Sequence, residues 1–329
     1  MTNPVLEVDD LYTHFFTRER GVVKAINGVS FSLNAGEIVA LVGESGSGKT
    51  VTALSILNIV PFPGRIFQGS IKYRGEDLVG VDEEKLRYIR GEEIAMIFQD
   101  PLAALNPVMN VGDQILEVIG AHRGHLSNEE KWEMASEAIK KVGLSDPERI
   151  LTSFPFQLSG GMAQRIMLAI GLMMEPAVLI ADEPTSALDV TLQAEIMEHL
   201  RSLKELHDTA VLLITHDMGL VAQMADHVLV MYAGSVVESG DVDTIFRRPA
   251  HPYTWALLQS VPRLDSDEGP LRPLPGSPPD LTDLPDECPF ISRCHRPSMT
   301  CRTSPRPALK QVGADQVAAC YHPLEPLDQ

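Results

Sequence analysis

The sequence predicts an α/β protein with a parallel sheet at its core and a small module at its C-terminal end. Two observations carry this prediction: strand and helix patterns alternate over much of the 329 residues, and the composition changes after about residue 262. Alternating strands and helices are typical of parallel sheets, because parallel neighbours need a crossover connection.

The first part of the chain predicts short strands and one helix. Apolar and polar residues alternate in the early strands, whereas the third segment is apolar throughout, as expected for a strand buried on both faces. The predicted strands cover residues 5–8, 29–33, 37–42 and 94–98, and the helix covers 49–60.

The middle of the chain predicts three helices and two more strands. Ser127, with Glu130 three residues later, predicts a capped helix that ends at Gly143. The other helices are predicted at 162–174 and 191–205, and the strands at 178–181 and 211–215.

The C-terminal part is different in composition. Eight prolines lie between Pro262 and Pro289, which excludes a continuous helix or a central strand. We interpret this stretch as an extended arm that leads to a module with all four cysteines. The predicted domains are residues 1–250 and 251–329.

Charge and hydropathy exclude several classes of protein. The chain has 27 basic and 45 acidic side chains, a net charge of −18, which argues against binding to nucleic acid. No apolar stretch reaches the ~18 residues of a membrane-spanning helix. The first residues lack the pattern of a secretion signal, so we expect a cytosolic protein with reduced thiols.

A glycine-rich loop follows the third predicted strand and fits the pattern G-x-x-x-x-G-K-[ST]. Such loops direct backbone N–H groups at phosphate oxygens. Lys49 is expected to reach the β- and γ-phosphates and Thr50 to bind Mg²⁺. A chance glycine-rich turn is the alternative, which the flanking strand and helix disfavour. The loop consists of Gly43, Glu44, Ser45, Gly46, Ser47, Gly48, Lys49 and Thr50.

Two carboxylates, Asp182 and Glu183, follow the apolar strand at 178–181. Ligands of open α/β sheets lie at the carboxyl ends of strands. We expect Asp182 to bind Mg²⁺ and Glu183 to polarise the attacking water. A solvated loop or helix cap is the alternative.

The string L-S-G-G-M-A-Q-R at residues 158–165 resembles the signature motif of ATP-binding cassette (ABC) ATPases, with Met162 where Gln is common. Four further motifs follow the order of that family, and the resemblance covers residues 5–246. They are the Q-loop at Gln99, the D-loop at 186–189 with Asp189, the switch residue His216, and an adenine-stacking aromatic at Phe15, with Phe16 as the alternative.

The resemblance implies a P-loop NTPase (RecA-like) core, an N-terminal antiparallel β-subdomain and a helical insert at about 101–175. It also implies that Ser159, Gly160 and Gly161 contact ATP held by a second subunit, and that Asp189 lies at ATP. The resemblance further implies that Gln99 joins Thr50 and Asp182 at Mg²⁺, and that Glu183 and His216 act at the γ-phosphate.

The string H-P-Y-T at 251–254 resembles the oligopeptide, dipeptide and nickel importers, in their D-type ATPase subunit. The resemblance implies a peripheral subunit at the cytoplasmic face of the membrane that energises uptake of di- or oligopeptides. Its partners would be a related ATPase, two permeases and, indirectly, a solute-binding protein. Oligosaccharide or nickel uptake is the alternative; a soluble ABC ATPase of translation or DNA repair fits a single acidic cassette poorly.

The four cysteines lie within 33 residues, at Cys288, Cys294, Cys301 and Cys320. Their spacing lacks the close pairs of zinc sites. Similar tails in peptide-importer ATPases imply a [4Fe–4S] cluster, while Zn²⁺, no metal and a disulfide stay open, as does ligation by His295 or His322. A protein that serves chiefly in iron–sulfur redox chemistry is a further alternative.

Overall fold

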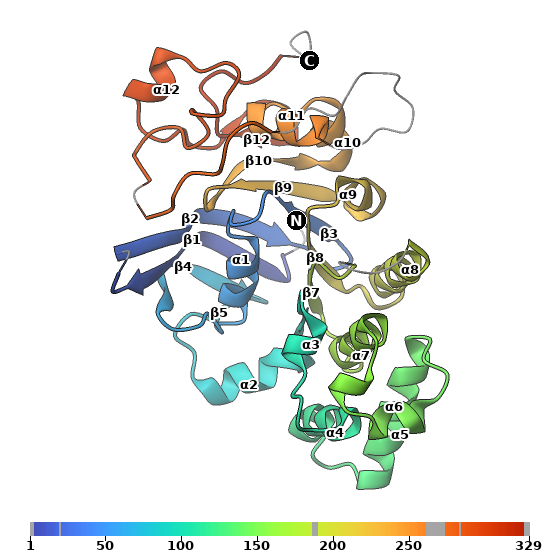
Figure 1. Cartoon of the computed structure of the whole chain (residues 1–329). Helices are drawn as coiled ribbons and strands as arrows, with labels where there is room; N and C mark the ends of the chain where they lie inside the picture. The colour runs from blue at the N-terminus through green and yellow to red at the C-terminus, as the bar shows by residue number, and fades with distance from the viewer. Residues whose placement is uncertain (1–2, 20, 186–189, 261–273, 283, 326–329) are drawn as a thin grey trace. The chain divides into compact units, whose positions relative to one another are not determined.

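The computed structural model describes residues 3–19, 21–185, 190–260, 274–282 and 284–325. The chain forms two compact units, each built from several segments of the sequence (Figure 1). Unit 1 contains residues 1–5, 33–37 and 80–213, and unit 2 contains residues 6–32, 38–79 and 214–329. The domain boundary at residue 250 stays a prediction.

Unit 1 contains the buried strands that the sequence predicted at 94–98, 178–181 and 211–215. The strand order is β8-β7-β6, and β6 pairs with β7 in parallel, with Ile94 opposite Val178. Every residue of these strands is buried, which explains their unbroken apolar sequences. They are β6 (Ile94–Ile97), β7 (Val178–Asp182) and β8 (Ala210–Thr215), whose last two residues are counted in unit 2.

Helices make up the rest of unit 1. The Ser127–Glu130 capping box is present at the start of α5, as predicted. Helix α7 begins at Gly160 and not at Met162, because the Ser159 hydroxyl caps it. The helices are α2 (Glu83–Glu92), α3 (Pro101–Ala104), α4 (Val111–His122), α5 (Asn128–Lys141), α6 (Pro147–Thr152), η1 (Pro155–Gln157), α7 (Gly160–Leu172) and α8 (Val190–His207).

Unit 2 contains the antiparallel β-subdomain, with strand order β2-β1-β4-β5. Strand β1 extends well beyond the predicted residues 5–8. The register shifts between Asp9 and Tyr12, and Asp10 has a φ of 46°, so the alternation that marks a strand is interrupted there. The strands are β1 (Leu6–Thr17), β2 (Gly21–Leu33), β4 (Gly64–Tyr73) and β5 (Glu76–Asp77).

The remaining strands of unit 2 follow the order β11-β12-β10-β9-β3. Strand β3 is parallel to β9, while β10 is antiparallel to both β9 and β12, so the C-terminal tail adds strands beside β10. These strands are β3 (Ile38–Val42), β9 (His227–Tyr232), β10 (Ser235–Asp241), β11 (Lys310–Gln311) and β12 (Gln316–Ala318).

The helices of unit 2 are short. Helix α1 ends at Ile56 and not at the predicted residue 60, because Asn58 takes a left-handed conformation with φ of 51°. The helices are α1 (Lys49–Ile56), α9 (Met218–Met224), α10 (Val242–Arg247), α11 (Pro252–Gln259) and α12 (Met299–Thr303).

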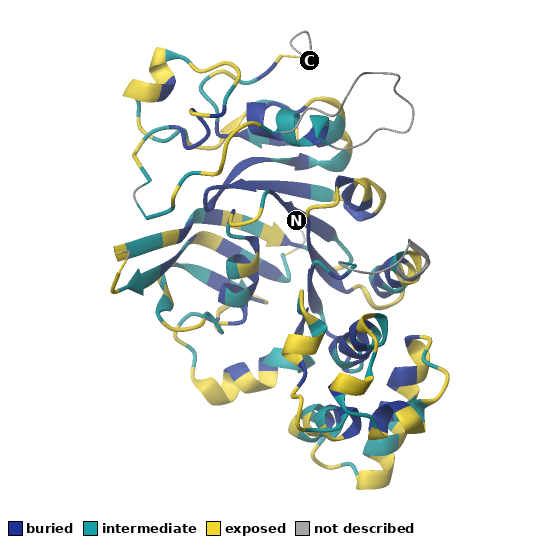
Figure 2. Cartoon of the chain, in the orientation of Figure 1, coloured by how far each residue is buried: buried dark blue, intermediate teal, exposed yellow. Residues whose placement is uncertain are grey.

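One hydrophobic cluster joins the cysteine tail to the strands of unit 2. Tyr232 of β9, Tyr253 of α11 and Phe290 of the tail are almost fully buried, and Cys288 and Cys301 belong to the same cluster. Figure 2 shows β9 and β10 mostly in dark blue, which marks their buried residues. The module therefore shares the core of this unit.

The described part of the proline-rich stretch contains no continuous helix or central strand, as the sequence predicted. Residues 274–282 and 284–298, which the structure describes, contain neither helix nor strand. None of the helices in the described ranges combines the length and apolar composition needed to cross a membrane.

Glu238 of β10 is a fully buried carboxylate that ties later parts of the chain to β10 within unit 2. Its oxygens accept hydrogen bonds from the backbone N–H of Ala250 at 2.7 Å and of His251 at 2.8 Å. The Gln316 amide of β12 donates a third bond at 2.7 Å. Burial raises the pKa of Glu238 above its usual 4.5.

Glu238→Ala is expected to lower the free energy of unfolding of unit 2 by about 3 kcal/mol or more, because three buried donors lose their acceptor. Wild-type stability is also expected to fall relative to Glu238→Gln as the pH rises from about 4.5 through the raised pKa of the folded state, since ionisation then favours the unfolded chain. Denaturation over a pH series measures both effects. Exposed Glu19 supplies the control, Glu19→Ala, which should leave stability unchanged.

Candidate functional site

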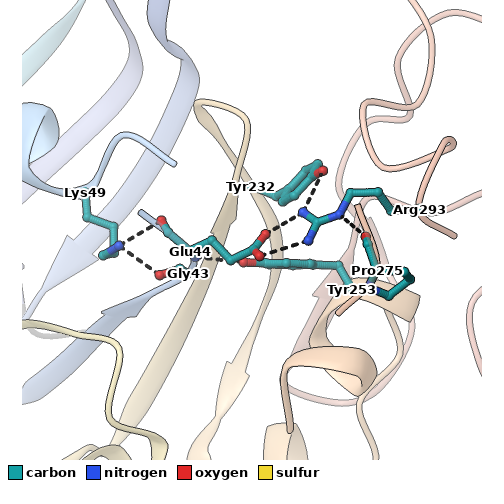
Figure 3. Close-up of polar contacts among 7 residues, drawn as sticks. All are labelled: Gly43, Glu44, Lys49, Tyr232, Tyr253, Pro275 and Arg293. Carbon is teal, nitrogen blue, oxygen red and sulfur yellow. Dashed lines mark hydrogen bonds and ion pairs between the residues drawn. The ribbon is translucent and has the colours of Figure 1, made fainter. Parts of the chain in front are cut away.

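The predicted phosphate loop connects β3 to α1 in unit 2. The Lys49 side chain lies over the loop, where its ammonium group donates to the carbonyls of Gly43 at 2.8 Å and Glu44 at 3.0 Å (Figure 3). Lys49 is only 7% exposed. The ammonium group is therefore held at the loop and not in bulk solvent.

Two glycines of the loop cannot be replaced without moving the backbone. A Cβ on Gly43 would lie 2.3 Å from the Met231 carbonyl oxygen, and one on Gly48 would lie 2.7 Å from the Ala25 carbonyl oxygen. Gly48 also has a φ of 108°. The glycine pattern therefore reflects close approach of the loop to neighbouring strands, as well as its tight turns.

The loop offers donors that suit an anion. Helix α1 starts at Lys49 with no capping side chain, so its positive end faces the loop. The Ser47 hydroxyl is buried, and among the described residues it meets no hydrogen-bond partner. Ser45, Gly46 and Thr50 are exposed. A phosphate group fits this set of donors.

Two residues far along the chain contact Glu44, and sequence reasoning missed this role for both. The Glu44 backbone N–H donates to the Tyr253 hydroxyl at 2.8 Å. The Glu44 carboxylate accepts from both terminal nitrogens of Arg293, at 2.5 and 2.9 Å (Figure 3). Tyr253 lies in the H-P-Y-T string, but no local pattern links either residue to the loop.

In unit 1, the predicted carboxylates lie at the end of β7. Asp182 is the last residue of the strand and is 1% exposed. Glu183 has a φ of 48°, a left-handed conformation that non-glycine residues seldom adopt and that clusters at functional sites. The Gln99 amide donates to the Glu183 carboxylate at 2.9 Å. The structure thus brings Gln99 and Glu183 together.

The signature residues form the start of α7, also in unit 1. Ser159 is the N-cap and accepts from the Met162 backbone N–H at 3.3 Å. Ser159 and Gly160 are exposed, so the N-terminal end of this helix is open to solvent. Gln164, which the sequence analysis did not single out, is buried and donates to the Pro184 carbonyl at 2.8 Å, linking α7 to the segment after Glu183.

The other predicted site residues are His216, Phe15 and Asp189. His216 is exposed directly after β8, in unit 2. Phe15 in β1 pairs with Gly64, while Arg65 covers the ring of the alternative residue, Phe16, at 4.3 Å. Asp189 and the rest of the predicted D-loop lie outside the described residues. The roles of these residues stay predictions.

The four cysteines line one small cavity of about 10 Å³ in unit 2, together with Phe290 and His322. The backbone N–H groups of Arg296 and His322 donate to the sulfurs of Cys294 and Cys320, both at 3.4 Å. Burial raises the pKa of Cys288 to about 11 and that of Cys320 to about 12. Within the described residues, no three histidines, cysteines or acids are close enough together to hold a metal ion as they stand.

Family patterns and solved structures define the class of this protein. The ABC transporter family matches residues 26–186, and the C-terminal region of oligopeptide/dipeptide transporters matches residues 237–301. The dimeric structure of MJ0796, a bacterial ABC transporter cassette, has a TM-score of 0.65 and 27% identity, covering 72% of this chain and 98% of that one. A post-hydrolysis structure of MJ0796 bound to ADP and Pi matches equally well. The chain is an ABC-type ATPase.

Curated relatives narrow the family. The oligopeptide transport ATP-binding protein OppD of Salmonella typhimurium is 43% identical over 99% of this chain and 96% of its own length. The dipeptide transport ATP-binding protein DppD of Escherichia coli is 43% identical over 98% of this chain and 97% of its own. The Bacillus subtilis OppD is 50% identical over 88% of this chain. The chain belongs to this family of oligopeptide and dipeptide transport ATP-binding proteins.

Proposed function

We propose that this chain hydrolyses ATP to energise a membrane importer of dipeptides or oligopeptides, at the cytoplasmic face of the membrane. The observation that carries the catalytic part is the Gln99–Glu183 hydrogen bond of 2.9 Å beside buried Asp182. The names of the relatives support the peptide substrate.

Glu183 is the general base in this proposal. Its carboxylate lies within reach of the Gln99 amide, so the two can orient one water molecule between a hydrogen-bond donor and an acceptor. The left-handed backbone of Glu183 fixes the direction of the carboxylate after β7. Lys49 neutralises charge that develops on the β- and γ-phosphates, and His216 contacts the γ-phosphate.

Asp182, Gln99 and Thr50 are the proposed Mg²⁺ residues. They offer a carboxylate, an amide oxygen and a hydroxyl, and hard divalent cations prefer oxygen donors of this kind. Bound Mg²⁺ would neutralise phosphate charge. A carboxylate as buried as that of Asp182, which is 1% exposed, suits a cation partner better than solvent.

The signature residues act on a second subunit in this proposal. Ser159, Gly160 and Gly161 form the open N-terminal end of α7, a position that attracts anions. The dimeric cassette structure of MJ0796 supports a pair of ATPases. We propose a related ATPase as the partner, together with two permeases and a solute-binding protein.

Glu183→Gln is expected to keep ATP bound while lowering turnover by roughly 10²–10⁴-fold, because a general base is lost and binding groups remain. Steady-state ATPase rates and equilibrium binding of ATP, measured on the assembled transporter, check both parts. Exposed Glu137 on α5 supplies the matched control, Glu137→Gln. Normal turnover in Glu183→Gln contradicts the assignment of the base.

The chain purified alone is expected to hydrolyse ATP at least about tenfold more slowly than the assembled transporter, because each site lacks the signature residues of its partner. Adding the partner ATPase and the permeases should restore the rate. A strict monomer with full activity contradicts the shared site.

The substrate class is tested by a direct comparison of uptake by the assembled transporter of labelled peptides, oligosaccharides and Ni²⁺.

We also propose that the four cysteines hold a [4Fe–4S] cluster. Four thiolates are the ligand set of such clusters, and hydrogen bonds to their sulfurs tune them. Support comes from the shared cavity and from the N–H donors to Cys294 and Cys320. The cavity of about 10 Å³ requires the cysteine loops to separate when a cluster is inserted.

Protein purified without oxygen is expected to show a visible absorbance band and equal amounts of iron and acid-labile sulfide. Cys294→Ser should remove most of both, because a ligand is lost, whereas Ser292→Ala, at an exposed position in the same turn, should not. Zinc in place of iron, or reduced thiols without metal, contradicts the cluster.

A further inference from the structure

Arg293 places a buried cation of the cysteine module against the phosphate loop. Its side chain is 3% exposed, and its bidentate pair with Glu44 spans 249 residues of sequence (Figure 3). The guanidinium also donates to the Pro275 carbonyl at 2.8 Å and to the Tyr232 hydroxyl at 3.3 Å. The hydrogen bond to Glu44 raises the pKa of Arg293, so the guanidinium stays charged.

The backbone of Arg293 is fixed by the cysteine module. The Arg293 N–H donates to the Phe290 carbonyl at 3.0 Å, and the Ile291 N–H donates to the Cys288 carbonyl at 3.1 Å. Cys294 follows directly and lines the cavity with the other three cysteines. A change at Cys288 or Cys294 therefore acts on the turn that carries Arg293.

On the other side, all polar groups of Glu44 are engaged. Its N–H bonds Tyr253, its carbonyl accepts from Lys49, and its carboxylate binds Arg293. The Lys49 ammonium group, which is expected to contact phosphate, donates to the Glu44 carbonyl. The position of Glu44 therefore affects the position of the Lys49 ammonium group. Tyr253 and Phe290 pack edge to face at 5.4 Å, so the tail also supports the acceptor of the Glu44 N–H.

The charges of Arg293 and Glu44 should have opposite effects on the binding of a polyphosphate. A carboxylate in a loop built for a polyphosphate repels that ligand unless a cation compensates it. Arg293 provides that cation from a buried position, where screening by salt is weak. Loss of Arg293 leaves the negative charge, whereas loss of the Glu44 charge leaves a positive one.

We propose that Arg293 is a positioning residue for the phosphate loop, through which the cysteine module sets the affinity of this chain for ATP. The inference rests on the proposed function of residues 43–50 in ATP binding. It assigns regulation of that binding to the C-terminal module, by way of the Arg293–Glu44 pair.

A double-mutant cycle on the full chain tests the pair. Arg293→Met should raise the Kd for ATP about tenfold, Glu44→Gln should lower it because the positive charge of Arg293 is left uncompensated, and the double variant should recover most of the loss seen in Arg293→Met. Arg293→Lys, which keeps the charge without the bidentate geometry, should fall between. Exposed Arg302 in α12 gives the control, Arg302→Met, with wild-type Kd.

A second measurement tests transmission from the module. Cys294→Ser should raise the Kd for ATP in the wild-type background but not in the Glu44→Gln/Arg293→Met background. Hydrogen exchange of residues 43–50 should rise in Arg293→Met and in Cys294→Ser. An equal effect of Cys294→Ser in both backgrounds overturns the proposed route.

The outcomes separate this inference from the proposed function. Lys49→Ala should abolish ATP binding, and if it binds ATP as the wild type does, the phosphate-loop assignment itself fails. If Lys49→Ala loses binding while folded Arg293→Met keeps the wild-type Kd, only the inference is overturned. Should Arg293→Met not fold, Arg293→Lys decides: an unchanged Kd overturns the inference and a raised Kd supports it.

Discussion

The phosphate loop depends on one constraint: at two of its glycines the backbone passes so close to neighbouring strands that a side chain has no room. Gly43 lies against the carbonyl of Met231 in β9, and Gly48 lies against that of Ala25 in β2. Strands from distant parts of the sequence therefore shape the loop, and the loop in turn places Lys49 and the start of α1. Tyr253 and Arg293, from later in the chain, also contact the loop at Glu44, so a loop of eight consecutive residues is supported by β2, β9 and the C-terminal part of unit 2.

In unit 1, the local structure holds the Glu183 carboxylate in a fixed direction. Buried β7 carries the chain to Asp182, and the left-handed residue Glu183 turns it sharply. The Gln164 amide of α7 donates to the carbonyl of the next residue, Pro184, so α7 and the segment after Glu183 share a buried hydrogen bond.

Structure that depends on a few adjacent residues could be predicted from the sequence, whereas contacts between distant residues could not. The Ser127–Glu130 box and the apolar strands predicted at 94–98 and 178–181 are present, at 94–97 and 178–182 in the case of the strands, because a few adjacent residues determine them. The full length of β1 was missed because a bulge at Asp10 breaks its alternation, and β4, β9 and β10 were also missed. The site motifs were readable as strings, but Arg293 lies 249 residues from Glu44, and no spacing rule connects them.

The buried carboxylate of Glu238 has a consequence for the order in which the protein is made. Its backbone partners at Ala250 and His251 follow soon after it, whereas Gln316 lies on β12 near the other end of the tail. During translation, the nucleotide-binding motifs leave the ribosome long before Gln316 does. Until β12 has been synthesised, the Glu238 carboxylate of the growing polypeptide must therefore stay hydrated or make only part of its final set of hydrogen bonds.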